Sequence, residues 1–269
     1  MNSEALKELC LQSRDIIKTA GAFIKQELGK VKANAIEVKA LNSLVSYVDK
    51  EAEIKLVKGL GDLLPGATFL TEEETVKSEA GAYQWIIDPL DGTTNFLHQL
   101  PFFSVSVALR HKEEIILGIV YEVNQDECFY AWKGGGSFLN DHPINVTQTA
   151  KLADTLIATG FPYYDYGPIK AYLAVLENLM QNTRGIRRFG SAALDLAYVA
   201  CGRFDGYFEY SLNSWDVAAG VLLVQEAGGQ VTDFQGGTDY LFGKQLIASN
   251  SAISEDFFQL IHRNFYPMG

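Results

Sequence analysis

Two acidic residues stand three positions apart within Trp85–Phe96, which reads Trp-Ile-Ile-Asp-Pro-Leu-Asp-Gly-Thr-Thr-Asn-Phe. Asp88 and Asp91 lie on either side of Pro89 and follow bulky apolar residues, which predict a buried strand that ends at Ile87. Because Pro89 has a fixed φ and no N–H, we expect the chain to turn sharply there. Carboxylates on both sides of such a turn could share hard cations such as Mg²⁺, which bind oxygen ligands.

The residues after Asp91 could bind an anion beside that cation. Gly92 allows a close approach of the backbone, and the Thr-Thr-Asn run that follows contains residue types that open or cap a short helix. The first N–H groups of a helix have no partner inside it and can receive a phosphate. The alternative is an ordinary strand–turn–helix, with Asp88 in the turn and Asp91 as a cap, because Asp-Pro and Asp-Gly are common turn signals.

Further acidic residues stand where other predicted elements begin or end. Residues 67–71 predict a short strand that runs into Glu72-Glu73-Glu74, which in isolation is typical of a solvated acidic loop. Asp216 begins a predicted helix that Ser214 could cap, and it follows an apolar strand that ends at Glu209. The chain therefore places several carboxylates at the ends of elements, where a binding site could form.

Taken together, these segments resemble the inositol monophosphatase family. Residues 85–96 resemble its first signature, and Trp215–Gly220 with Glu226–Gly229 resemble its second. The similarity covers nearly the whole chain, because residues 68–73, Gly160-Phe161-Pro162 and Gly190-Ser191-Ala192 also fit. The resemblance implies an α/β fold arranged as a layered α/β/α/β/α sandwich. We expect one catalytic domain over residues 1–269, with an antiparallel sheet in a lobe of about 1–150 and an α/β lobe of about 151–269.

The resemblance also implies the activity. Family members are Mg²⁺-dependent, lithium-sensitive phosphomonoesterases and are usually homodimers. Carried over by motif, Glu72, Asp88 and the Leu90 carbonyl would hold a first metal, and Asp88, Asp91 and Asp216 a second. A third, weaker ion near Glu72 gives two to three Mg²⁺ per site.

The catalytic residues implied by the resemblance are Glu72, Thr93 and Asp91. Glu72 with the Thr93 hydroxyl would orient and deprotonate the attacking water. Phosphate oxygens would bind the N–H groups of Gly92 and Thr93. The alcohol part of the substrate would face Ala192, Glu209 and Asn213, beside Asp216.

Some positions match the family less closely. Three residues are weaker candidates for the site. Lys39 matches a family lysine near an N-terminal hairpin, Asp49 matches a carboxylate near the third metal, and Glu73 is the second residue of the Glu-Glu pair. For Asp49, stabilisation of the helix dipole in a first turn is at least an equal interpretation. Thr71 stands where the family usually has a Gly before the Glu-Glu pair. This substitution alters the freedom of the backbone but removes no metal ligand. Asn213 replaces the His of the animal enzymes, which affects substrate identity more than catalysis.

The leading hypothesis is therefore hydrolysis of a small polyol or sugar monophosphate, with myo-inositol monophosphate as the first candidate. Fructose 1,6-bisphosphate, histidinol phosphate, 3′-phosphoadenosine 5′-phosphate and NADP are alternative substrates. A bisphosphate would need a basic pocket, for which the candidates are Lys170, Arg184, Arg187 and Arg188, although surface charge or dimer contacts are the favoured interpretation of that cluster. Other hypotheses are a regulatory binding protein of the same fold and an inert scaffold with capping acids.

Composition limits the possible partners. The net charge of −11, from 33 acidic and 22 basic residues, argues against general nucleic-acid or anionic-membrane binding. A phosphate ligand remains compatible, because bound cations reverse the local field. Three widely spaced cysteines predict buried, reduced thiols, and we expect a cytoplasmic protein because neither a signal-peptide pattern nor a bilayer-spanning apolar run is present.

Periodicity predicts the remaining elements. From Ser104 consecutive strands indicate an antiparallel sheet, in which Gly134-Gly135-Gly136 forms a hairpin or bulge, and the second half alternates helices and strands. We expect a loop or short hairpin over 36–47, helices over 6–28, about 46–64, 168–182, 192–201, 215–228 and 254–265, and strands over 104–111, 115–122, 128–132, 155–159, 184–189, 205–209, 230–234 and 246–249.

Overall fold

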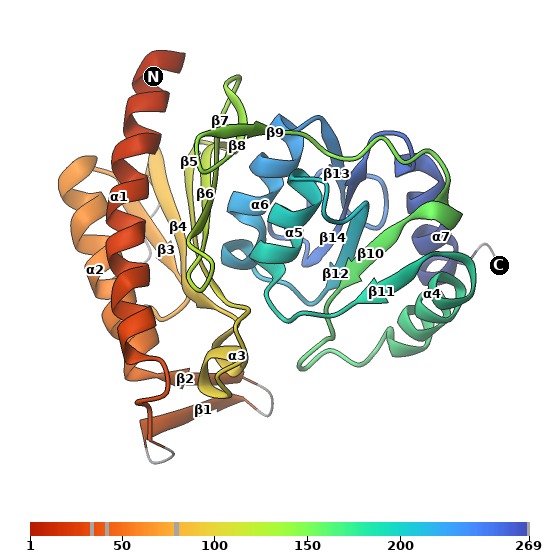
Figure 1. Ribbon diagram of the computed structural model, residues 1–269, viewed down its shortest axis with the longest axis horizontal. Helices are drawn as coiled ribbons and strands as arrows, with labels where there is room; N and C mark the ends of the chain where they lie inside the picture. Colours follow the sequence, from red (N-terminus) through yellow and green to blue (C-terminus); the bar gives the residue numbers. More distant parts are fainter. Residues whose placement is uncertain (33–34, 41–42, 78–80, 268–269) are drawn as a thin grey trace.

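The computed structural model describes residues 1–32, 35–40, 43–77 and 81–267, and its helices and sheets alternate in five layers (Figure 1). Helices α1 (Ser3–Glu27) and α2 (Tyr47–Leu63) pack on one face of a seven-stranded sheet. The other face contacts α5 (Ala192–Ala200) and α6 (Ser214–Glu226), which lie between this sheet and a five-stranded one. Helices α4 (Ile169–Asn182) and α7 (Ser254–Phe265) form the last layer. The predicted α/β/α/β/α sandwich is confirmed.

The seven-stranded sheet has the order β3-β4-β5-β6-β7-β8-β9. From β5 onward each strand pairs antiparallel with the next, as predicted; β4 also pairs antiparallel with β5, and β3 joins parallel to β4. The strands are β3 (Thr68–Thr71), β4 (Tyr83–Asp91), β5 (Ser104–His111), β6 (Glu114–Glu122), β7 (Glu127–Trp132), β8 (Gly136–Leu139) and β9 (His142–Ile144). The triple glycine lies in the β7–β8 hairpin, as predicted.

The five-stranded sheet has the order β11-β10-β12-β14-β13. Strand β10 pairs parallel with β11 and β12, whereas β14 pairs antiparallel with β12 and β13. Its strands are β10 (Leu156–Thr159), β11 (Gly185–Arg187), β12 (Gly206–Tyr210), β13 (Gly229–Thr232) and β14 (Gln245–Asn250). Short elements complete the fold: the predicted hairpin of β1 (Ile36–Ala40) and β2 (Ser43–Ser46), helix α3 (Thr93–Leu97) and the 3-10 helix η2 (Leu152–Asp154).

The predicted end of a strand at Ile87 is wrong, because β4 continues to Asp91. Asp88 pairs with Ser106 and Asp91 with Ser104, so two residues of β4 stand opposite one residue of β5 in a β-bulge. A bulge accommodates Pro89, which has no N–H for the ladder. The turn comes one residue after the strand, at Gly92 (φ 97°), a backbone angle that glycine adopts without strain.

A second correction concerns the start of α6. Its N-cap is Asn213 and not Ser214, because the Asp216 carboxylate accepts a hydrogen bond from the Asn213 N–H and begins the helix one residue earlier than expected. The consequence is that Asp216 lies at the third helical position, with its side chain turned back toward the helix start.

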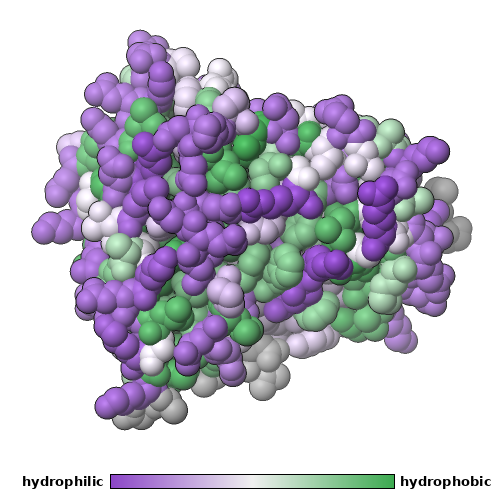
Figure 2. Space-filling view, in the orientation of Figure 1, coloured by the Kyte–Doolittle hydropathy of each residue, from purple (hydrophilic) through white to green (hydrophobic). Residues whose placement is uncertain are grey.

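Three apolar cores fill the spaces between the five layers, and one of them extends to both sides of α5 and α6. Trp85 and Ile87 pack toward α1 and α2, whereas Ile86 between them packs toward α5 and α6. Burial on both faces explains why residues 85–87 of β4 are all apolar and do not alternate with polar residues. The third core lies between the five-stranded sheet and helices α4 and α7. The face in Figure 2 is mainly hydrophilic and is interrupted by apolar patches.

The cysteine prediction is confirmed for two of three side chains. All three thiols are free, Cys10 and Cys128 are buried, and Cys201 is half-buried. Across the described ranges of the chain, none of the helices is both long and apolar enough to cross a membrane.

Candidate active site

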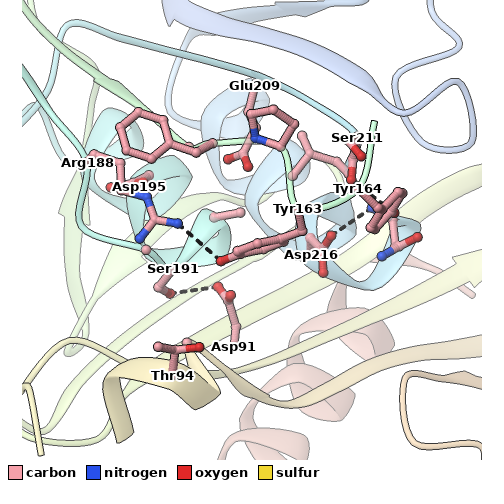
Figure 3. A pocket seen from close by; sticks show the side chains of 18 of the residues that line it. Asp91, Thr94, Tyr163, Tyr164, Arg188, Ser191, Asp195, Glu209, Ser211 and Asp216 are labelled. Carbon is pink, nitrogen blue, oxygen red and sulfur yellow. Dashed lines mark hydrogen bonds between the residues drawn. The ribbon is translucent and has the colours of Figure 1, made fainter. Parts of the chain in front are cut away.

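A cavity of about 800 Å³ opens where the two sheets and α3, α5 and α6 meet. Side chains from elements distant in sequence turn into it, among them Asp91 of β4, Glu209 of β12 and Asp216 of α6 (Figure 3). The structure brings together here most of the residues singled out in the sequence: Glu72, Asp88, Leu90, Asp91, Gly92, Thr93, Ala192, Glu209, Asn213 and Asp216.

Asp91 connects β4 to the start of α5. Its Oδ2 accepts hydrogen bonds from the Ser191 hydroxyl (2.6 Å) and the Ala193 N–H (2.7 Å). Burial raises the pKa of Asp91 to about 6, against the lowering effect of these bonds and with a further rise from the Glu72 charge. The two hydrogen bonds therefore hold the carboxylate in one orientation, although burial makes its ionised form unfavourable.

The neighbouring carboxylates share this environment. Asp88 is 2% exposed, and its Oδ1 accepts a hydrogen bond from the Leu90 N–H (2.9 Å). Burial raises the pKa of Asp88 well above its ordinary value, and the charges of Glu72, Asp91 and Asp216 raise it further. The pKa of Asp216 rises in the same way, through burial first and then through the Asp91 charge. Cations bound among these groups would offset the repulsion that each now experiences.

The donor chemistry of this cluster fits a hard divalent cation. Carboxylate and carbonyl oxygens are the ligands that Mg²⁺ binds, and Glu72, Asp88, Asp91, Asp216 and the Leu90 carbonyl supply them. As the side chains stand, no group of three or more His, Cys, Asp or Glu residues in the described part of the chain is arranged to hold a metal. The individual ligand sets therefore stay predictions.

Thr93 connects the cavity to a carboxylate on a distant helix. Its hydroxyl lies 2.8 Å from Asp49 Oδ1 and 3.0 Å from the Leu90 carbonyl oxygen, and it can donate its proton to either. Asp49 Oδ2 accepts the N–H and the hydroxyl of Ser46, which completes a capping box at the start of α2. Asp49 thus has a structural role in α2 and also contacts a predicted catalytic residue.

The other two weaker candidates are Glu73 and Lys39. Glu73 does not line the cavity, and its backbone N–H donates to Glu53 Oε2 (2.8 Å). Lys39 lies in β1, but its side chain is outside the described residues.

Glu53 was missed in the sequence. It is fully buried, and Oε1 accepts the N–H and the hydroxyl of Thr75 at 2.8 and 2.6 Å, beside the Glu73 N–H on Oε2. These bonds fix the segment that carries Glu72. The one available signal was the place of Glu53 directly after Ala52 on the apolar side of α2.

Replacing Glu53 by Ala should therefore loosen the Glu72 segment. Three donors would lose their acceptor, and we expect the free energy of unfolding to fall by about 2–4 kcal/mol. Urea denaturation measures this, and Glu51→Ala, an exposed position on the same helix, should change it by less than about 0.5 kcal/mol. Equal effects of the two substitutions would contradict the role given to Glu53.

One residue of the basic cluster lines the cavity. The Arg188 guanidinium bonds the Tyr163 hydroxyl (3.2 Å) and lies 5.1 Å from the centre of the Phe161 ring, so aromatic residues hold it at the cavity. Arg184 pairs with Asp154, and Arg187 donates to the Ile186 carbonyl; neither lines the cavity. The cavity wall also includes an aromatic loop over residues 161–166. The sequence analysis named Phe161 and Pro162 of this loop but missed Tyr163, Tyr164 and Tyr166.

Comparisons with known proteins agree with this geometry. A sequence model described as the inositol monophosphatase family matches residues 6–265. The chain is 42% identical over 245 residues to inositol-1-monophosphatase of Mesorhizobium japonicum, covering 91% of this chain and 92% of that protein. It is 40% identical over 237 residues to Nus factor SuhB of Escherichia coli, covering 88% and 89%.

Solved structures show the same similarity. The crystal structure of extragenic suppressor protein suhB from Bartonella henselae superposes with a TM-score of 0.89 at 40% identity, covering 96% of this chain and 98% of that one. The IMPase of Thermotoga maritima gives a TM-score of 0.86 at 34% identity, with the same coverage.

Proposed function

The chain belongs to the inositol monophosphatase family, and from that premise we propose that it is a Mg²⁺-dependent phosphomonoesterase. Its substrate class is the small polyol or sugar monophosphates, with myo-inositol monophosphate first. Lithium inhibition, a homodimer and a cytoplasmic location belong to the same proposal.

The main support for this proposal is the cluster of four acidic residues in the cavity. Glu72 follows β3, Asp88 and Asp91 lie in β4, and Asp216 lies in α6. The four acids meet in one cavity, where burial and mutual repulsion raise the pKa values of the three aspartates. An ordinary fold has no use for so many buried and half-buried acids at one place, whereas a site for cations and a phosphate does. The turn at Gly92 places the start of α3 directly beside them.

The residues have separable roles in hydrolysis. Bound Mg²⁺ would neutralise the phosphate charge and lower the pKa of a water molecule. Glu72, Asp88, Asp91, Asp216 and the Leu90 carbonyl would hold the ions, and Gly92 and Thr93 would bind phosphate oxygens through their N–H groups. A phosphoryl transfer of this kind needs positioning and charge stabilisation more than a covalent nucleophile.

Water activation would depend on Thr93. When its hydroxyl donates to Asp49, the Thr93 oxygen keeps lone pairs that can accept a hydrogen bond from the attacking water and so orient it. Glu72 stands at the same cavity as a second acceptor and general base. Asp49 is then a positioning residue that acts through Thr93.

The part of the cavity beyond the phosphate position would bind the alcohol. Glu209, Asn213 and Ala192 line it, and the carboxylate and amide can hydrogen-bond hydroxyl groups. Because Arg188 lines the cavity and could bind a second phosphate, bisphosphates stay alternative substrates, together with histidinol phosphate and NADP.

A second candidate is a regulatory binding protein of the same fold. It is supported by relatives named Nus factor SuhB, whose name does not describe a phosphatase. In that role the function would survive substitution of Asp91, which a phosphatase would not tolerate.

The test is phosphate release from sugar, polyol and nucleotide phosphates, with Mg²⁺ and with a chelator. We expect release that depends on Mg²⁺ and is fastest with myo-inositol 1-phosphate. The same metal dependence on another substrate would keep the reaction and replace the substrate. No metal-dependent release from any compound would contradict the phosphatase proposal.

A further inference from the structure

Asp195 is a buried acid at the cavity to which the sequence signatures assign no role. It lies in the first turns of α5, one turn after Ala192, and is 1% exposed. It lines the cavity, and within the described structure its Oδ1 has no hydrogen-bond partner. A buried polar oxygen without a partner lowers stability, so its presence calls for an explanation.

The groups around Asp195 are mainly acidic. The charges of Glu209 and Asp91 act on it unfavourably and that of Arg188 favourably, and burial is the largest cause of its raised pKa. Hydrogen bonds fix the neighbours but leave Asp195 out: Asp91 bonds Ser191 and Ala193, and Glu209 Oε2 accepts the Tyr207 hydroxyl. Asp91 and Glu209 are therefore held by hydrogen bonds, whereas Asp195 Oδ1 is left without a partner in the described structure.

Glu209 lies directly beside Gly160, on the strand that pairs with β10. A Cβ atom on Gly160 would lie 1.9 Å from Glu209 Oε2, so the glycine leaves space for the carboxylate in its present position. Glu209 and Asp195 thus come from β12 and α5 to one cavity, and Figure 3 shows both there with Arg188. The site offers carboxyl oxygens to a ligand that carries hydrogen-bond donors.

We propose that Asp195 determines specificity by binding, together with Glu209, hydroxyl or ammonium donors on the alcohol part of the substrate. This inference rests on the proposed phosphatase function and narrows its substrate class. A leaving group without donors, such as a nitrophenolate, would leave the Asp195 oxygen unpartnered and gain nothing from it. A polyol or amino alcohol would satisfy it.

The test compares two substrates, myo-inositol 1-phosphate and 4-nitrophenyl phosphate, for wild type, Asp195→Asn and Asp195→Ala with saturating Mg²⁺. We expect kcat/KM for myo-inositol 1-phosphate, divided by kcat/KM for 4-nitrophenyl phosphate, to fall about tenfold or more in the variants. The reason is that only inositol phosphate loses a hydrogen bond to a carboxylate. The change should lie mainly in KM for inositol phosphate, with 4-nitrophenyl phosphate nearly unaffected.

Asp205→Asn is the matched control. Asp205 is also buried, but it bonds the Thr147 hydroxyl and the Leu156 N–H and does not line the cavity. Its variant should keep the wild-type ratio. Melting temperatures show whether each variant folds, and we expect Asp195→Ala to be at least as stable as wild type because an unpartnered buried oxygen is removed.

Two results would overturn the proposal and are distinguishable. Folded Asp195 variants with an unchanged substrate ratio would show that Asp195 does not contact the alcohol, while the phosphatase function stands. A wild-type protein that releases no phosphate from either substrate would remove the proposed function and this inference with it.

Discussion

Asp91→Asn is expected to lower Mg²⁺-dependent phosphate release by roughly 10³-fold, because charge stabilisation by metal ions contributes several kcal/mol to such reactions. The amide keeps an oxygen that can accept the bonds from Ser191 and Ala193, so the link between β4 and α5 should persist. The substitution therefore removes the negative charge of Asp91 and leaves the surrounding structure nearly unchanged.

Stability measurements separate loss of metal binding from loss of folding. Without metal, Asp91→Asn should melt at or above the wild-type temperature, since burial raises the pKa of Asp91 and its ionised form destabilises the fold at neutral pH. Mg²⁺ at 100 times its dissociation constant should stabilise wild type by about 2.7 kcal/mol and the variant far less.

The control for Asp91 is again Asp205→Asn, because Asp205 likewise accepts one hydroxyl (2.6 Å) and one backbone N–H (2.7 Å). It should retain Mg²⁺-dependent hydrolysis. If Asp91→Asn kept more than about a tenth of wild-type activity, the assignment of Asp91 to the metal site would be wrong, since that loss is worth only about 1.4 kcal/mol.

The second large effect is expected at Gly118, in β6, where α6 approaches the sheet. Gly118 stands between Ala108 of β5 and Ala131 of β7, and a Cβ atom on it would lie 2.6 Å from the Ala219 carbonyl oxygen. Because that oxygen belongs to the backbone, it can move only with the helix. The small residues therefore set the distance between α6 and the sheet.

Gly118→Val should lower the free energy of unfolding by about 3 kcal/mol or more, through overpacking against α6. Since Asp216 lies in the first turn of α6, displacement of that helix should also weaken hydrolysis. Thermal or urea unfolding measures the first effect, and phosphate release the second.

Gly61→Ala is the matched control. It lies inside α2, and the nearest atoms to its new Cβ would be those of the Phe69 ring at 3.6 Å, an ordinary contact. A helical Gly→Ala change should be neutral or stabilising by up to about 1 kcal/mol. A Gly118→Val protein as stable as this control would show that the distance between α6 and the sheet is not fixed by Gly118.

The sequence by itself determined the order and type of most elements and the layered fold. The apolar period of α1, the alternation of β5 and the glycines between strands are local properties, so they are readable without the structure. Part of the cavity was predicted in the same way, because the segment from Trp85 to Phe96 carries carboxylates and turn-forming residues side by side. Ala192, Glu209 and Asn213 were predicted from the family resemblance.

Only the tertiary structure decided how these residues act together. The bulge that keeps Asp88 and Asp91 in one strand depends on pairing with β5, which the local Asp-Pro turn signal does not contain. The Thr93–Asp49 contact spans 44 residues, and the Asp91–Ser191 bond spans 100. Glu53 and Asp195 became visible only through burial. The physical reason is common to all of them: hydrogen-bond partners and desolvation depend on which elements pack together, and that packing is a property of the whole chain.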